Sequence, residues 1–522
     1  MKFYWVNFHN FCLTNIVRID ILFFMNESFR IAQKIGLMFL PNSPIPTDIK
    51  QWATQQLRSK SPALGIKSAS SYKKPQVLEW PKSLQPSLQK RDEMFWAFKE
   101  NKEKFRRNMP GFQTEADKSR NRQENLMEDL DALKFAHRNV YGEDQLRLRF
   151  SSFWANHFRT ANIFDNGNHI GHAIDEAILA NINSDFSNML YKVTTHPSML
   201  IYLDNTYSAG PNSNEAVWAR NNGRQAGLND NLGRELLELH TVSPTANYTE
   251  ADIKAAAKIL AGWGAEPGRI SGDRLISLSE RNRKIKEIGG TLNSWDYYKT
   301  NYAEPGNKTV LGKTFGPGKG ALRQLTDFLA DHEHTINHVT FKLAQHFVSD
   351  NPSQTDLDHI SRIWRESNGN LDQMHTAVIE RAIASKEPKF QWPMNWLFQV
   401  TRLSGANAFV GWEEEKNNDY NDNIMRTRKI FEELGQGFWL PGQPNGYSSD
   451  KAEWLSGEMF ERRIRFATSL YNGGFPTQRV EDIMNRIGAN NVTRELVGSV
   501  MGGRRKFVAL MCSPEIMGLE NA

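Results

Sequence analysis

The sequence is poor in cysteine and in long apolar runs, and each shortage excludes a class of protein. Of its 522 residues only Cys12 and Cys512 are cysteines, which excludes a disulfide framework and a cysteine-rich zinc or iron–sulfur site. No stretch reaches the ~18 uncharged apolar residues that a membrane-spanning helix needs. Apolar residues nevertheless make up 39% of the chain, enough for a large buried core, so the composition is that of a globular protein.

Residues 1–24 differ from the rest of the chain because they are rich in aromatic side chains. They hold seven aromatic residues and end in four apolar ones, but polar and charged residues interrupt the apolar run and no small-residue cleavage site follows. This pattern makes a poor secretory signal. Our preferred interpretation is that translation starts at Met25 and that residues 1–24 are a mis-assigned start or an unstructured leader. The alternative is a weak signal or a membrane-surface anchor.

Excess positive charge is confined to the first quarter of the chain, although the formal net charge is +5. Residues 1–122 hold 21 Lys and Arg against 10 Asp and Glu, whereas residues 123–522 hold 43 against 49. The basic side chains at 99–122 alternate with acidic ones, which is typical of a solvated helical face rather than of a nucleic-acid footprint. We therefore expect no nucleic-acid partner.

Helical periodicity dominates the chain from about residue 90. Between 262 and 320 it gives way to Gly, Asn, Ser and aromatic residues, and Lys308–Gly312 has the pattern of a short strand. We expect a mainly α fold, a large irregular multi-helix array with a small β or irregular insert near 262–320. The expected segments are the leader, 1–24; an N-terminal helix with an extended Pro/Ser-rich wrap, 25–89; a helical lobe that carries the candidate site, 90–261; the insert, 262–320; and a C-terminal helical lobe, 321–522.

His157 is the first candidate for chemistry. At helical spacing it falls on the same stripe as Leu146, Phe150 and Phe153, so it lies on an apolar face at the end of its helix. One interpretation is a core histidine that hydrogen-bonds a nearby carbonyl. The other is a general base or a ligand, and this one requires an acidic partner nearby.

The segment Asn229–Thr241 supplies such acidic partners. On a helix its polar residues share one arc beside a leucine stripe; they are Asn231, Arg234, Glu235 and Glu238. An amide and two carboxylates on one face can hold a metal or a sugar, with the carboxylates as ligands or hydrogen-bond acceptors and Arg234 as an anchor. The alternative is an exposed face on which Arg234 and Glu238 pair at i, i+4.

Asp204 and Asn205 close a third polar block. The preceding residues, His196–Leu203, have the pattern of a short apolar helix with proline in its first turn. That helix places Asp204 and Asn205 at the start of a polar segment, 206–228. The pair is either a helix-ending turn or part of a binding site, because a loop of this length is usually functional or an insertion.

Taken in chain order, these blocks resemble DUF1800, a bacterial domain family of unknown function. The blocks that carry the resemblance are Trp154-Ala155-Asn156-His157-Phe158, Pro197-Ser198-Met199-Leu200-Ile201-Tyr202-Leu203-Asp204-Asn205, Arg234-Glu235-Leu236-Leu237-Glu238-Leu239-His240-Thr241, Tyr248-Thr249-Glu250-Ala251-Asp252, Gly262-Trp263, Gly306-Asn307-Lys308-Thr309-Val310-Leu311-Gly312, Lys342-Leu343, Leu434-Gly435-Gln436 and Ser513-Pro514-Glu515. Two departures stand out. Ala155 replaces the first His of the usual Trp-His-Asn-His-Phe block, and Tyr302-Ala303 replaces a frequent His-Asp pair.

The resemblance implies a largely helical protein with no established reaction. Many members look exported, and their genes often lie beside an exported sulfatase-like family, so a protein of that kind is the partner that analogy suggests. The compartment stays open, because the sequence has no convincing export signal whereas the family analogy points to the envelope.

We predict one pocket that gathers residues from all three polar blocks. The catalytic candidates are His157, Glu235 and Glu238, and the substrate-binding candidates are Asp204, Asn205, Asn231 and Arg234. No cofactor or metal is assigned. Two functions remain open: an envelope-associated enzyme or enzyme accessory that acts on a polar, carbohydrate-like substrate, and a non-catalytic helical scaffold that partners another exported protein.

Overall fold

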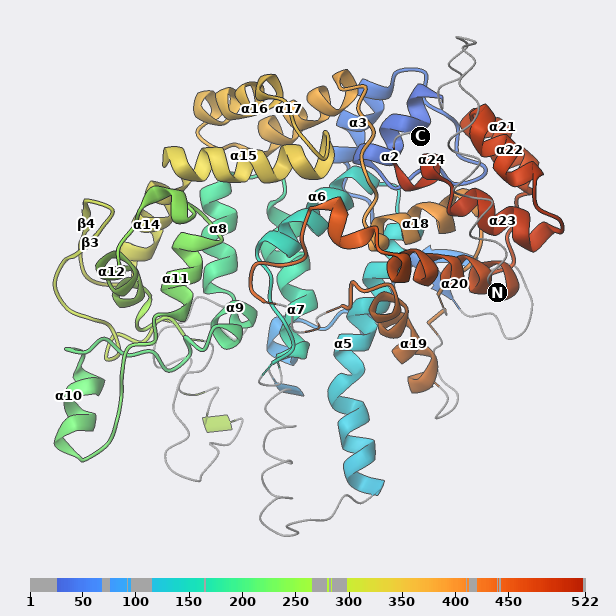
Figure 1. The fold of residues 1–522 in the computed structure, drawn as a ribbon. Coiled ribbons are helices and arrows are strands. Elements are labelled where there is room, and N and C mark those ends of the chain that lie inside the picture. The colour runs from blue at the N-terminus through green and yellow to red at the C-terminus, as the bar shows by residue number, and fades with distance from the viewer. Residues whose placement is uncertain are drawn as a thin grey trace.

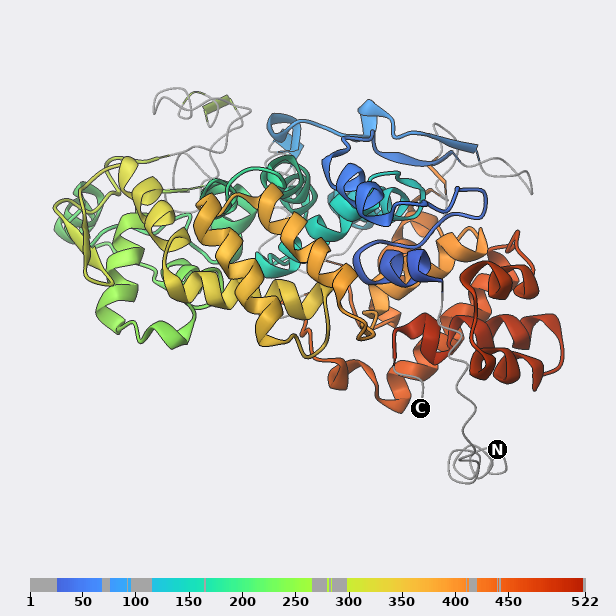
Figure 2. The same ribbon diagram turned by 90° about the horizontal axis from the view of Figure 1, so that it is seen from above.

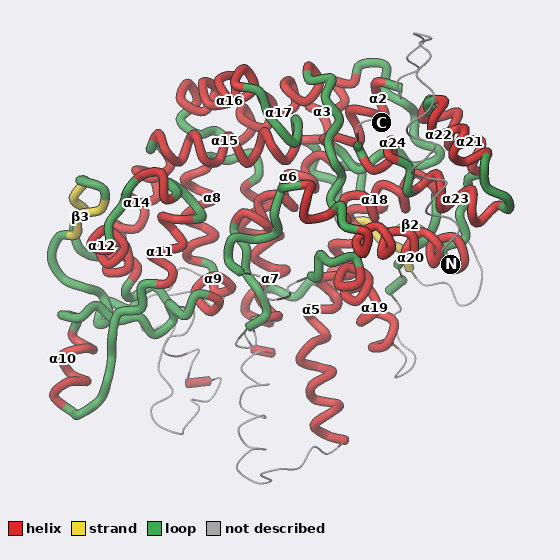
Figure 3. The backbone as a smooth tube through the Cα atoms, in the orientation of Figure 1, coloured by secondary structure: helices red, strands yellow, loops and turns green. Residues whose placement is uncertain are grey.

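The computed structural model describes residues 26–67, 76–91, 93–94, 115–163, 166–264, 279–280, 283, 298–409, 411–412, 420–438, 440 and 443–519. Within these residues the fold is mainly helical, as the sequence predicts, with two small two-stranded sheets (Figures 1 and 3). The leader 1–24 and residues 99–114 of the basic stretch lie outside the described residues.

The first half of the chain begins beside the C-terminal helices and then builds the opposite end of the molecule (Figure 1). Its elements are α2 Glu27–Ile35, α3 Ile49–Arg58, β1 Leu64–Lys67, β2 Gln76–Glu79, α5 Glu115–Tyr141, α6 Gln145–His157, α7 Gly167–His172, α8 Phe186–Thr195, α9 Pro197–Tyr202, α10 Asn214–Asn221, α11 Asn231–Glu238 and α12 Glu250–Leu260.

The second half returns across the molecule and ends in a group of short helices. Its elements are β3 Lys308–Val310, β4 Lys313–Phe315, α14 Gly320–Ala330, α15 Glu333–Phe347, α16 Gln354–Ser367, α17 Leu371–Ala384, α18 Pro393–Ser404, α19 Tyr420–Glu433, α20 Gly457–Gly473, α21 Val480–Ile487, α22 Asn491–Gly498, α23 Gly503–Met511 and α24 Pro514–Met517. Figure 2 shows the elongated outline, with α20–α23 at one end and α8–α14 at the other.

Two local sequence patterns form the structures that their residues favour. Thr249 and Asp252 have the spacing of a capping box and form one at the start of α12. The strand predicted at Lys308–Gly312 is β3 followed by a tight turn. Leu311 and Gly312 both have positive φ in that turn, at 47° and 78°, and consecutive left-handed residues are what a two-residue hairpin turn requires.

Two helices lie where the sequence analysis expected extended chain. Helix α3 interrupts the Pro/Ser-rich wrap, and the Asp48 side chain caps it by accepting a hydrogen bond from the Gln51 N–H. Helix α10 interrupts the polar segment 206–228, capped in the same way by Ser213. Both expectations were wrong because an Asp or Ser N-cap can start a short helix even where the surrounding composition is polar.

Two large buried clusters hold the helices together. The first surrounds Trp154 and Trp364 and joins α6, α8, α9, α11 and α12 to the α14–α17 layer. The second surrounds Trp396 and Phe431 and joins α2 and α5 to the C-terminal helices. Among the described residues, no helix combines the length and the apolar character needed to cross a membrane. Cys512 is buried and carries a free thiol.

Candidate functional site

The end of α9 separates Asp204 and Asn205 into two different environments. Asp204 has φ +53° and is exposed, and its carboxylate accepts a hydrogen bond from the Asn229 side chain at 3.2 Å. Asn205 is buried, and its amide donates to the carbonyls of Leu260 and Trp263 at 3.2 and 2.9 Å. Asn205 therefore fastens the turn after α9 to the C-terminal end of α12, while Asp204 faces solvent.

The polar face of α11 is used mainly to attach the next helix. Arg234 makes a bidentate ion pair with Glu250, at 3.0 and 3.1 Å, and Glu238 accepts a hydrogen bond from the Tyr248 hydroxyl at 3.0 Å. The expected i, i+4 pair between Arg234 and Glu238 is therefore replaced by contacts with the start of α12. A bidentate guanidinium–carboxylate pair across two helices has better geometry than an intrahelical pair.

Glu235 is the exception on this face. It is half-buried, and its carboxylate has no hydrogen bond or ion pair with any described residue. Burial raises its pKa, as does the neighbouring Glu238, while Arg234 opposes the shift. Burial therefore makes Glu235 a weaker acid than an ordinary glutamate.

His157 ends α6 inside the first buried cluster. Its Nε2–H donates to the carbonyl of His240 at 3.2 Å, and its ring lies 4.6 Å from that of Phe158, centroid to centroid. Burial, above all, and then the nearby Lys342 lower the pKa of His157 well below its usual value. The imidazole is therefore neutral, and it bonds the backbone just beyond α11, the arrangement of a core histidine.

Helix α15 brings two residues to His157 that the sequence analysis did not select, His338 and Lys342. The His157 ring lies 6.4 Å from that of His338 and 6.3 Å from that of His240. Burial lowers the pKa of Lys342 to about 8. His338 and Lys342 stand at i, i+4, a spacing that signals a shared helix face, but nothing in the sequence connects that face to His157.

Each histidine of this cluster keeps one buried ring nitrogen without a hydrogen-bond partner among the described residues. These atoms are Nδ1 of His157, Nδ1 of His240 and Nε2 of His338. They do not form a metal site, because no group of three or more His, Cys, Asp or Glu side chains in the described part of the chain is arranged to hold a metal ion.

An open polar depression lies between the end of α9 and the start of α11. Its volume is about 520 Å³, and its lining consists of Asp204, Tyr207, Ser208, Gly227, Leu228, Asn229, Asp230 and Asn231. Of the seven predicted site residues, it brings together Asp204 and Asn231. Glu235 lies one turn along α11 from Asn231 on the same face, whereas Asn205, Arg234, Glu238 and His157 hold helices together outside it.

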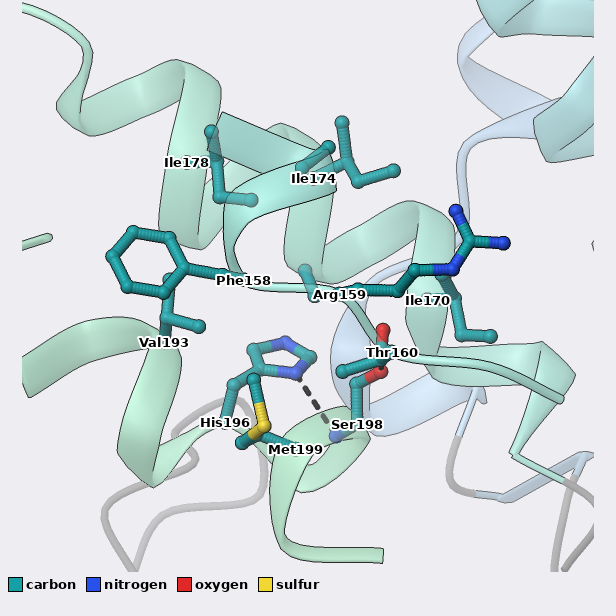
Figure 4. Close-up of a pocket in the computed structure, with 12 residues that line it drawn as sticks. Phe158, Arg159, Thr160, Ile170, Ile174, Ile178, Val193, His196, Ser198 and Met199 are labelled. Atoms are coloured by element: carbon teal, nitrogen blue, oxygen red, sulfur yellow. Dashed lines mark hydrogen bonds between the residues drawn. The ribbon is translucent and has the colours of Figure 1, made fainter. Parts of the chain in front are cut away.

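A second hollow marks the position where the chain departs from the family pattern. Ala155 lines a cavity of about 30 Å³ together with Phe158, His196 and Ser198. Figure 4 shows His196 below Phe158, with its Nδ1 accepting the Ser198 N–H at 3.1 Å. A space of this size holds one or two waters and no substrate. The hollow beside Ala155 is therefore too small to be a second binding site.

Comparison with known proteins identifies the family of the chain but no individual relative. The family model described as "Protein of unknown function (DUF1800)" matches residues 45–509, nearly the whole chain. No curated protein matches the chain, and no solved structure matches it.

Proposed function

The chain belongs to this family of unknown function, DUF1800, and we propose that it binds a polar, hydroxyl-bearing ligand such as a carbohydrate in the depression between α9 and α11. The observation that carries the proposal is the set of residues that line this depression. Two carboxylates, Asp204 and Asp230, and two amides, Asn229 and Asn231, meet beside the ring of Tyr207. Carboxylates and amides accept and donate the hydrogen bonds of hydroxyl groups, and an aromatic ring offers a flat apolar surface beside them.

The wall of the depression is firmly anchored. Glu304 accepts hydrogen bonds from both the backbone N–H and the side-chain amide of Asn212, each at 2.8 Å. The Gly210 N–H donates to the Tyr302 carbonyl at 2.9 Å. These contacts fix the segment that leads from the depression into α10. Within the lining itself, the Asn229 N–H donates to the Ser208 hydroxyl at 3.1 Å, so part of the polar lining is held in place before a ligand arrives. Such preorganisation lowers the entropic cost of binding.

Glu235 is the residue we assign to proton transfer, if the bound ligand reacts. Its carboxyl group is half-buried, has a raised pKa and makes no hydrogen bond with a described residue. It stands one helical turn along α11 from Asn231, which lines the depression. A protonated carboxyl beside a bound hydroxyl compound can act as a general acid. This assignment would make the protein an envelope-associated enzyme or enzyme accessory.

A second candidate function is that of a non-catalytic scaffold for another exported protein. It is favoured by the contacts of Asn205, Arg234, Glu238 and His157, each of which joins one helix to another segment. Side-chain groups engaged in such contacts hold segments of the fold together and are not available to a ligand.

Binding to an array of immobilised glycans separates the two functions. Asp204→Gly removes the carboxylate without straining the left-handed backbone, and Asn231→Ala removes the exposed amide. Losing one charge-assisted hydrogen bond should weaken glycan binding ~10-fold or more. The control is Asp358→Ala, an exposed aspartate on α16, which should bind as the wild-type protein does.

The role of Glu235 is tested on whichever glycan the array retains. Glu235→Gln should leave binding within a small factor of wild type and slow any turnover, followed by mass spectrometry, ~10²-fold or more. If no glycan is retained by the wild-type protein, or if Asp204→Gly binds as tightly, the carbohydrate proposal fails and the scaffold is the better account.

A further inference from the structure

Two large apolar side chains stand in solvent near the C-terminal end of the chain. Met501 is 83% exposed and Phe475 is 66% exposed. Phe475 also has φ +49°, a left-handed conformation that is a genuine outlier for a bulky residue. A strained and exposed aromatic residue gains little from packing within the fold, and strain of this kind tends to persist where a residue serves binding.

These two side chains belong to the same corner of the molecule. Phe475 follows the last residue of α20 by two positions, and Met501 precedes the first residue of α23 by two positions. The end of α20 contacts the start of α23. The Tyr471 hydroxyl on α20 lies 2.8 Å from the position that a Cβ on Gly503 would occupy. The ring centroids of Tyr471 and Phe507 are 5.4 Å apart. Figures 1 and 2 both place α20 and α23 at one extremity of the molecule.

Two arginines accompany this apolar pair. Arg504 and Arg505 open α23 and are exposed, and neither forms an ion pair with a described residue. Other basic side chains nearby are engaged: Arg486 donates to the carbonyls of Leu40 and Ser43, and Lys506 lies 4.0 Å from Glu481. We call Phe475, Met501, Arg504 and Arg505 the C-terminal corner.

The first described residue is attached to the same group of helices. The Asn26 N–H donates to the carbonyl of Ile487, the last residue of α21, at 2.8 Å. A membrane-surface anchor is one of the two interpretations of residues 1–24, which lie outside the described residues. The C-terminal corner points to a membrane surface from described residues alone.

We infer that the C-terminal corner docks the protein onto an anionic membrane surface. Phe475 and Met501 would insert between headgroups, because apolar side chains gain free energy at the boundary of the acyl chains. Arg504 and Arg505 would lie against lipid phosphates, to which an arginine donates bidentate hydrogen bonds. A lipid surface suits this corner because exposed apolar side chains stand beside two arginines without an ion pair among the described residues, the combination that binds an anionic headgroup region.

The inference is tested by co-sedimentation of the full chain with vesicles of phosphatidylcholine, with and without phosphatidylglycerol. Binding should need the anionic lipid and weaken as salt is added. Arg504→Gln with Arg505→Gln should weaken binding ~25-fold, about five-fold for each arginine. Phe475→Asn with Met501→Ser should weaken it ~10-fold or more. Asparagine at 475 tolerates the left-handed backbone.

A matched control is Phe341→Ser. Phe341 is likewise an exposed large apolar residue, on α15, and its loss should leave vesicle binding unchanged. The inference is overturned if wild-type protein does not sediment with anionic vesicles, or if it sediments equally with pure phosphatidylcholine. It is also overturned if both corner variants bind as wild type does, since the lipid contact would then lie elsewhere in the chain. Because all four corner residues are exposed, unchanged thermal unfolding should show that the variants remain folded.

Discussion

The buried imidazole of His375 makes a specific prediction about how acid destabilises this protein. His375 is fully buried on α17 and stacks on Phe150 with a ring-centroid distance of 4.0 Å. Its Nε2 accepts a hydrogen bond from the indole N–H of Trp154 at 3.0 Å. Because Nε2 is the acceptor, it carries no proton in the folded protein. Protonation at that nitrogen would break the bond to Trp154 and bury a positive charge.

The effect on stability follows from the difference in pKa between the folded and unfolded states. Burial lowers the pKa of His375 from 6.5 to about 3, although Asp372 opposes the shift. The folded state therefore binds fewer protons than the unfolded state between these values. The stabilisation is complete above the unfolded pKa and is lost as the pH falls toward the folded pKa. The free energy of unfolding should fall by ~2 kcal/mol at about pH 5 and by ~5 kcal/mol below the folded pKa.

His375→Gln isolates this contribution, because a glutamine amide can accept the same hydrogen bond but does not titrate. Urea unfolding, followed by tryptophan fluorescence, gives the free energy of unfolding of both proteins at about pH 7 and about pH 5. Between these conditions wild type should lose ~2 kcal/mol more than the variant. The other titrating groups are common to both proteins and cancel in the comparison.

If the free energy of unfolding falls equally in the two proteins between about pH 7 and about pH 5, the reasoning is refuted. Equal losses would mean that His375 is either solvated or already charged at neutral pH, and that its contact with Trp154 does not require a free lone pair. A variant that is less stable than wild type by the same amount at both pH values would refute it equally, because the prediction concerns the pH dependence and not the absolute stability.

Two further predictions concern polar contacts inside the fold. Asn205→Ala removes the amide that binds the carbonyls of Leu260 and Trp263, so urea unfolding should show a loss of about 2–4 kcal/mol. Asp204→Gly should cost less, and equal losses would contradict the assigned role. Arg428→Met leaves Glu128 and Asp129 buried without their shared cation, 3.0 and 3.1 Å away, at a cost of about 3–5 kcal/mol at about pH 8. That cost should shrink near pH 6, because burial raises the pKa of Glu128 to about 7 and the carboxyl is then largely uncharged. Thermal unfolding at both pH values tests this, and a loss of stability that does not depend on pH would contradict it.

The sequence predicted the fold class and most helices because their signals are local. The capping box at Thr249 joins residues three positions apart, and β3 pairs with β4 across at most seven positions. Such short-range signals survive any tertiary context that does not oppose them. The predictions failed for α3 and α10, where a single capping residue started a helix in a polar stretch. Composition averaged over such a stretch hides a signal that one side chain carries.

The candidate site, too, is predicted by local signals in part and decided by tertiary contacts in part. Helical periodicity alone makes Asn231 and Glu235 neighbours, and the apolar stripe alone places His157 facing a core. Whether a polar residue on such a face binds a ligand or another helix depends on segments far away in the chain. Arg234 pairs with Glu250 at 3.0 Å because α12 packs against α11, and it keeps only a longer contact, 3.8 Å, with Asp230 at the start of its own helix.

The sequence by itself determined that this chain is mainly helical, that it lacks a disulfide framework and that it belongs to the DUF1800 family, since composition, periodicity and ordered motifs need no third dimension. Only the tertiary structure decided which polar residues are still available to bind a ligand. It gave Asn205, Arg234 and Glu238 hydrogen-bond partners from other segments, and it left Asp204 and Asn231 lining an open depression. The physical reason is that a polar side chain bonds only to groups that packing brings within reach, and in a folded chain those groups come from whichever segment packs against it.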